Sequence, residues 1–128
     1  MSVKVDLDEL AGHVAAYGLA YLLTVTDDHR AHAVAVRPVV TADAVTVDGL
    51  GRRTLANVDA RPDVSLVWPP TEDGGYTLIV DGRATATDGG ASIAPSHAVL
   101  HRPADHAPGT EPSDATACGN DCLPVAEG

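Results

Sequence analysis

Most of the architectural information in this chain lies in the stretch Gly49-Leu50-Gly51-Arg52-Arg53-Thr54-Leu55-Ala56-Asn57-Val58-Asp59-Ala60-Arg61-Pro62-Asp63-Val64-Ser65-Leu66-Val67. A short Val-rich strand over residues 44–47 leads into a turn that Gly49 and Gly51 bracket. Residues 52–59 have helical character, with Leu55 and Val58 on one side, and Arg61-Pro62 ends the helix. Residues 63–68 then form another strand. The segment therefore predicts a strand, a glycine turn, a short helix and a second strand.

The opening of this short helix is suited to an anion. The first turn of a helix presents free backbone N–H groups and the positive end of the helix dipole. Arg52 and Arg53 add charge there, and a guanidinium can contact a phosphate through two hydrogen bonds. Thr54 adds a hydroxyl donor. The alternative is that both arginines are solvated ends of a surface helix, and spacing alone does not choose between the two.

The segment before this stretch predicts a helix and a hairpin. Asp6 followed by Glu9 is typical of a capping box, and an apolar stripe at helical spacing follows it. Its members are Leu7, Leu10, Val14 and Tyr17. Gly18 would end this helix in a left-handed conformation. Residues 19–26 and 31–40 then read as two strands joined by the polar turn 27–30.

The segment after it predicts two more strands. Residues 76–87 alternate between a polar face and an apolar face, as expected for a half-buried strand. The apolar face consists of Tyr76, Leu78, Val80, Gly82 and Ala84. Residues 93–100 form the last strand. We therefore predict a mainly β fold, a six-stranded antiparallel split β-barrel with an N-terminal helix and a short helix between strands 3 and 4. Closure into a barrel removes exposed sheet edges.

Composition bounds the class of protein. The chain has 128 residues, with no Phe, one Trp and three Tyr, so Val, Ala and Leu must pack its core. Its formal net charge of -10 disfavours nucleic acid and anionic membranes as partners. The start of the chain lacks the apolar core of a signal peptide, and no apolar run approaches the length of a membrane span. We expect a cytoplasmic protein.

The composition changes after Arg102. No Lys or Arg follows it, and prolines are scattered among acidic and small residues. We therefore divide the chain into a barrel domain, residues 1–102, and an acidic, Pro-rich C-terminal tail, residues 103–128. The tail carries Cys118 and Cys122. These thiols could share a metal with His101 or His106, act as a redox pair, or simply be exposed, and the exposed alternative is favoured.

Histidine and tryptophan side chains offer further candidates for metal, substrate or interface contacts. His97 and His101 are an even number of residues apart on one strand, where a polar barrel rim is a simpler explanation than a metal pair. His32 lies on the second strand and is a candidate for substrate contact. Trp68 is expected to pack in the core or at a dimer interface. We predict no metal site.

Several of these segments, taken in order, resemble the FMN-binding split-barrel family, the pyridoxamine 5′-phosphate oxidase-like proteins. The matching segments are Arg53-Thr54-Leu55-Ala56-Asn57-Val58, Asp59-Ala60-Arg61-Pro62-Asp63-Val64-Ser65-Leu66, Val80-Asp81-Gly82-Arg83-Ala84 and Ile93-Ala94-Pro95-Ser96-His97-Ala98-Val99-Leu100-His101. The resemblance covers roughly residues 6–102.

The resemblance implies a homodimer that binds FMN or the deazaflavin F420 at the seam between subunits. The phosphate would meet Arg52, Arg53, Thr54 and Asn57. The ring would lie against the second strand, near Val34, Ala35, Val36 and Arg37. The implied function is that of an FMN- or F420-dependent oxidoreductase, with hydride transfer to or from a small conjugated substrate. No catalytic acid or base is assigned.

The chain departs from the family pattern between its last two strands. The family carries a helical insert there that often covers the cofactor ring, whereas only residues 88–92 join the strands here. This keeps two alternatives open, a non-catalytic carrier of the cofactor and a degenerate barrel that has lost the cofactor. The cysteine pair keeps a third open, a regulatory barrel that acts through Cys118 and Cys122.

Overall fold

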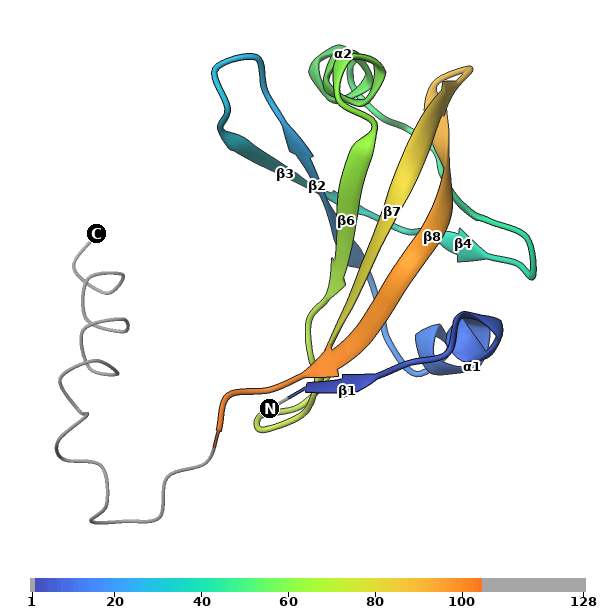
Figure 1. Cartoon of the computed structure of the whole chain (residues 1–128), viewed down its shortest axis with the longest axis vertical. Coiled ribbons are helices and arrows are strands. Elements are labelled where there is room, and N and C mark those ends of the chain that lie inside the picture. Colours follow the sequence, from blue (N-terminus) through green and yellow to red (C-terminus); the bar gives the residue numbers. More distant parts are fainter. Residues whose placement is uncertain (1, 105–128) are drawn as a thin grey trace, which may run out of the picture.

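The computed structural model describes residues 2–104 (Figure 1). Its elements in chain order are β1 (Ser2–Lys4), the 3-10 helix η1 (Leu7–Glu9), α1 (Leu10–Val14), β2 (Ala20–Val25), β3 (Ala31–Val36), β4 (Val39–Val40), β5 (Val45–Val47), α2 (Arg52–Ala60), β6 (Asp63–Trp68), β7 (Thr77–Thr87) and β8 (Gly90–His101). Cys118, Cys122, His106 and nearly all of the predicted tail lie outside the described residues. None of the described helices is long and apolar enough to cross a membrane.

The strands form because apolar and polar residues alternate along them. In β7, Leu78, Val80, Gly82 and Ala84 are buried, as the sequence predicts. The core that these faces build contains no Phe and depends on small aliphatic side chains. Trp68 is fully buried among them, so it packs in the core of a single chain. The other fully buried large side chains are Leu10, Leu22, Leu66, Leu78, Ile93, Val45, Val47, Val58, Val80 and Thr24.

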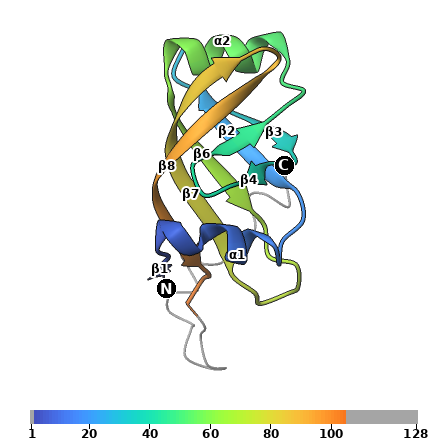
Figure 2. The same ribbon diagram turned by 90° about the vertical axis from the view of Figure 1, so that its right-hand side faces the viewer.

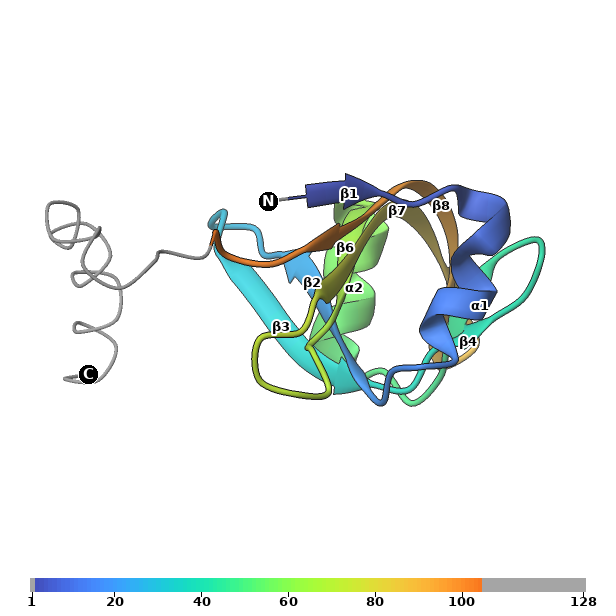
Figure 3. The same cartoon turned by 90° about the horizontal axis from the view of Figure 1, so that it is seen from below.

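One antiparallel sheet curls into the predicted barrel (Figures 1 and 3). The strands follow the order β3-β2-β6-β7-β8-β5-β4, and β1 pairs with β8. The first and last strands of this path, β3 and β4, are separated in sequence only by Arg37-Pro38. They are the two halves of the predicted strand 31–40. The first half pairs with β2 and the second with β5, so this bent segment joins the two ends of the sheet.

The strand count differs from the prediction for two reasons. The predicted strand 31–40 is interrupted near Pro38, and a short strand, β1, pairs with β8 in the register Ser2 with His101. The expectation of six strands missed β1 because three residues carry no periodicity that distinguishes a strand. The mainly β class, the antiparallel pairing and the barrel itself are confirmed.

The N-terminal helix is shorter than predicted. It consists of η1 and a single turn of α1, and Asp6 makes no side-chain capping bond. The predicted capping box and the stop at Gly18 were therefore wrong. Tertiary packing explains the difference, because only Leu10 of the apolar stripe is buried while Leu7 remains 42% exposed. Val14 and Tyr17 are only partly buried against the core, so one full burial in the stripe does not sustain a longer helix.

Helices α1 and α2 lie at opposite ends of the barrel (Figures 1 and 2). Near α1, the hydroxyl of Tyr17 donates a hydrogen bond to the backbone oxygen of Tyr76, 3.0 Å away. Burial raises the pKa of Tyr17 above its ordinary value. Arg102 stacks on the ring of Tyr76, with 4.6 Å between its guanidinium carbon and the ring centroid. These contacts hold the loop between β6 and β7 against the lower end of the barrel.

A β-bulge interrupts the pairing of β7 with β8. Asp81 pairs with His97 and Gly82 pairs with Pro95, which leaves Ser96 as the extra residue. The strands approach so closely there that a Cβ on Gly82 would lie 2.7 Å from the backbone oxygen of Ala94. Only glycine fits this position without a shift of the backbone.

We therefore expect Gly82→Ala to lower the free energy of unfolding by about 2 kcal/mol, because overpacking at a site bounded by backbone costs roughly 1–3 kcal/mol. Urea denaturation measures the change. Gly12→Ala in α1 is the matched control, since a Cβ there meets nothing within 4 Å. It should leave stability unchanged or raise it by up to about 1 kcal/mol. Equal effects of the two substitutions would contradict the steric account of the bulge.

Candidate functional site

The loop that leads into helix α2 is hydrogen-bonded to the turn of the β7–β8 hairpin. Gly49 has φ +71°, a conformation that favours glycine, and Gly51 at the N-cap is extended. The backbone N–H of Leu50 donates to the oxygen of Gly89 in the β7–β8 turn, 3.0 Å away. The two glycines of the sequence motif thus turn the chain from β5 into the helix, as the pattern predicts.

The inner face of α2 combines Val58 with two polar residues that contact the β2–β3 hairpin. Thr54 and Asn57 are 2% and 7% exposed. The Thr54 hydroxyl lies 3.3 Å from Nε2 of His32, and the side-chain N–H of Asn57 donates to Oγ1 of Thr24 over 3.0 Å. At the other end of the helix, Arg61 forms an ion pair of 2.8 Å with Asp27 in the turn of the hairpin. These three contacts fix the orientation of α2 on the sheet.

The outer face of α2 carries unneutralised charge. Arg52 and Arg53 are exposed and, like Arg37, make no ion pair with another residue in the range 2–104. The remaining arginines have partners. Arg30 pairs with Asp28, Arg61 with Asp27 and Arg83 with Asp63, while Arg102 stacks on Tyr76. Arg37, Arg52 and Arg53 therefore differ from the other arginines in residues 2–104, each of which has a partner, and they are the three that sequence analysis assigned to the cofactor site.

A groove of about 460 Å³ lies beside the end of β3. It is lined by Leu19, Ala35, Val36, Arg37 and Asp48. Asp48 begins the loop that leads into α2, so the groove is continuous in sequence with the turn before Arg52. Because β3 is paired only with β2, half of its backbone groups are not used by the sheet at this edge. The groove thus combines an apolar floor, free backbone groups and a guanidinium.

The predicted site residues fall into four sets. Ala35, Val36 and Arg37 line one groove, and Arg52 and Arg53 lie exposed on the first turn of α2. Thr54 and Asn57 face the sheet, where protein atoms engage their side chains. Val34 is half-buried and packs against the core. Within residues 2–104 there is no group of three or more side chains that could hold a metal ion.

Sequence reasoning missed two polar residues that build the site. Thr24 falls in the buried register of β2, with Ala20 and Leu22, and a polar residue in such a register needs a partner. That signal could have identified it. Asp48 gave no comparable signal, because a carboxylate before a glycine turn is ordinary turn chemistry.

Comparisons with known proteins support the fold. No family model matches the chain. It is 43% identical to the uncharacterized proteins Mb0449c of Mycobacterium bovis and MT0457 of Mycobacterium tuberculosis, over 94% of each chain.

Three solved structures share the architecture at low sequence identity. An FAD-binding protein from Mesorhizobium loti aligns with a TM-score of 0.62 and 11% identity, covering 80% of this chain and 98% of its own. A candidate pyridoxamine 5′-phosphate oxidase from Listeria innocua aligns with a TM-score of 0.62 and 14% identity, over 73% and 96% of the two chains. An F420 reductase aligns with a TM-score of 0.54 and 14% identity, covering 62% of this chain and 87% of its own. At these identities the likeness shows the fold alone.

The Asn57–Thr24 hydrogen bond should be measurable as a coupling energy. Asn57→Ala leaves a buried hydroxyl without its donor, so we expect it to cost about 1–3 kcal/mol of unfolding free energy. Thr24→Val should cost a similar amount, and the double variant should cost less than the sum by about 1 kcal/mol. Asp59→Ala, exposed on the same helix, is the control and should change stability by less than about 0.5 kcal/mol. Strict additivity of Asn57→Ala and Thr24→Val would show that the hydrogen bond does not anchor α2.

Proposed function

The chain belongs to the same family as the two mycobacterial proteins, and we propose that this split-barrel protein binds FMN or the deazaflavin F420 and acts as an oxidoreductase on a small conjugated substrate. The observation that carries the proposal is electrostatic. In a chain with a formal net charge of -10, Arg37, Arg52 and Arg53 lie without a carboxylate partner at the groove and at the adjoining helix turn. An anionic group supplies the charge that would neutralise them.

Solved neighbours are in keeping with a flavin-type cofactor, since proteins of this fold include an F420 reductase and FAD-binding proteins. We assign the phosphoryl group to Arg52, Arg53 and the backbone N–H groups of the first turn of α2. Thr54 and Asn57 contribute by holding that turn against β2 and β3.

The ring is assigned to the groove at the end of β3. Ala35 is exposed and offers an apolar contact, while the free edge of the strand offers backbone hydrogen bonds to the polar edge of the ring. Arg37 adds a positive charge beside it. A bound flavin or deazaflavin supplies the hydride acceptor or donor, and these residues supply position and electric field.

A cytoplasmic homodimer is part of the proposal. Tyr21 on β2 and Val39 on β4 are 41% and 59% exposed. Large apolar side chains at this exposure are suited to burial against a second copy, in keeping with a cofactor site shared between subunits.

A cofactor carrier is the second candidate. The β7–β8 connection is a tight turn at Asp88-Gly89, so no segment between these strands covers the groove. Arg37 and Asp48 are the only ionisable residues that line it among those described. A carrier would bind the cofactor with the same residues but would show no turnover with any reductant.

The decisive measurement compares ligands that differ only in phosphate. We expect FMN to bind more tightly than riboflavin, because riboflavin cannot engage the guanidiniums. Arg52→Gln/Arg53→Gln should weaken FMN binding about 10- to 100-fold, as expected for two partly exposed charge-assisted hydrogen bonds, and leave riboflavin binding unchanged. Fluorescence titration with FMN, FAD, F420 and riboflavin measures these affinities.

Arg30→Gln/Arg83→Gln is the matched control. This control also removes two positive charges, but from exposed ion pairs elsewhere on the barrel. It should therefore leave FMN affinity within about 2- to 3-fold of the parent. Equal affinity for FMN and riboflavin, or equal losses in the two double variants, would refute the phosphate assignment.

A further inference from the structure

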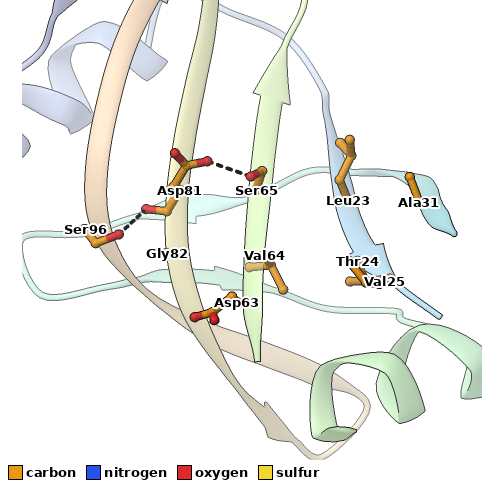
Figure 4. A pocket seen from close by; sticks show the side chains of 10 residues that line it. All are labelled: Leu23, Thr24, Val25, Ala31, Asp63, Val64, Ser65, Asp81, Gly82 and Ser96. Atoms are coloured by element: carbon orange, nitrogen blue, oxygen red, sulfur yellow. Dashed lines mark hydrogen bonds between the residues drawn. The ribbon is translucent and has the colours of Figure 1, made fainter. Parts of the chain in front are cut away.

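The barrel wall opens between β2 and β6. Their pairing ends at Leu23 opposite Ser65, and beyond this point the two strands pair only with β3 and β7. On the inside, α2 covers the opening through the hydrogen bond from Asn57 to Thr24. On the outside, the opening is a groove of about 440 Å³ (Figure 4). It lies at the start of β3, so it is separate from the groove at the end of that strand.

At one end of this groove lies the carboxylate of Asp81, which neighbouring hydroxyl groups hold in position. The hydroxyl of Ser65 donates to Oδ1 of Asp81 over 2.6 Å, and Ser96 donates to the backbone oxygen of Asp81 over 3.2 Å (Figure 4). Ser96 is the extra residue of the β-bulge, so the bulge places this hydroxyl beside Asp81. The other carboxylate oxygen, Oδ2, faces Nδ1 of His97 at 3.7 Å, beyond hydrogen-bond distance.

The remainder of the groove is apolar or already neutralised. Leu23, Val25 and Ala31 form the side opposite Asp81 (Figure 4). Asp63, also in the lining, has Arg83 at 3.6 Å. No Lys or Arg lines the groove. A ligand that entered it would therefore meet one oriented carboxylate, two hydroxyls and a short apolar wall.

We propose that this groove binds a protonated amine attached to a short apolar group. An ammonium group has three donors and a positive charge, which suit the free oxygen of Asp81 and the two serine hydroxyls. Its alkyl chain would cover Leu23, Val25 and Ala31. An anion is disfavoured by the carboxylates, and a neutral ligand would leave Oδ2 of Asp81 with only the His97 ring, 3.7 Å away. The proposal does not depend on cofactor binding.

The test uses n-butylammonium, n-butanol and butyrate as probes of one shape and three charges. Amide chemical shifts are followed in the full chain at one fixed pH for all three probes. We expect n-butylammonium to shift the amides of Leu23, Ser65 and Asp81 and to bind at least about 10-fold more tightly than n-butanol. Butyrate should not bind.

Asp81→Asn should reduce n-butylammonium affinity to that of n-butanol, while Asp88→Asn, which removes the same charge from the exposed β7–β8 turn, should not. Equal binding of amine and alcohol to the parent protein would overturn the proposal, and this comparison needs no variant. Shifts confined to other residues, or equal effects of the two Asn variants, would also overturn it. Nα-acetyl-lysine methylamide is titrated in the same way, as a mimic of a lysine residue in a protein. If it binds more tightly than n-butylammonium, the natural ligand is a lysine side chain of a protein; if it binds more weakly, the natural ligand is a free amine.

Discussion

The position of helix α2 depends on a polar contact in a mostly aliphatic interior. Asn57 donates to Thr24 where the pairing between β2 and β6 has ended, and Thr54 meets His32 on the neighbouring strand. A buried polar group without a partner is costly, so these contacts specify one orientation for the helix. That orientation directs Arg52 and Arg53 outward and closes the barrel wall from inside. The groove at the start of β3 includes Thr24 in its lining and so borders this contact directly.

The distribution of charge follows from this scaffold. Three of the seven arginines form ion pairs that tie turns and neighbouring strands together, and Arg102 stacks on Tyr76. The charges without such a partner are Arg37 at the end of β3 and Arg52 and Arg53 on the first turn of α2. Acidic residues dominate the chain as a whole, so these three positive charges contrast with the charge of the rest of the chain. A small anionic ligand can therefore be favoured locally even though the average field repels large polyanions.

Periodicity and glycine placement were sufficient to predict the long strands, helix α2 and the barrel. The alternation in β7 and the Gly49–Gly51 turn are local signals, and both proved reliable. What the sequence could not show arises from long-range packing. The helix before β2 is short because only Leu10 of its apolar stripe is fully buried, and β1 exists because residues 99–101 of β8 pair with it. The inward orientation of Thr54 and Asn57 likewise depends on Thr24 and His32, which lie 33 and 22 residues away.

Strand β8 has a central place in this topology, since it pairs with β1, β5 and β7. The residues of β1 are far from β8 in sequence, and pairing between such distant segments slows folding because a long loop must close before the strands can pair. During synthesis on the ribosome, β1 and β5 would emerge well before the strand that completes their hydrogen bonds. The barrel can therefore close only after residues 90–101 have left the exit tunnel, and until then its aliphatic strands are candidates for chaperone protection.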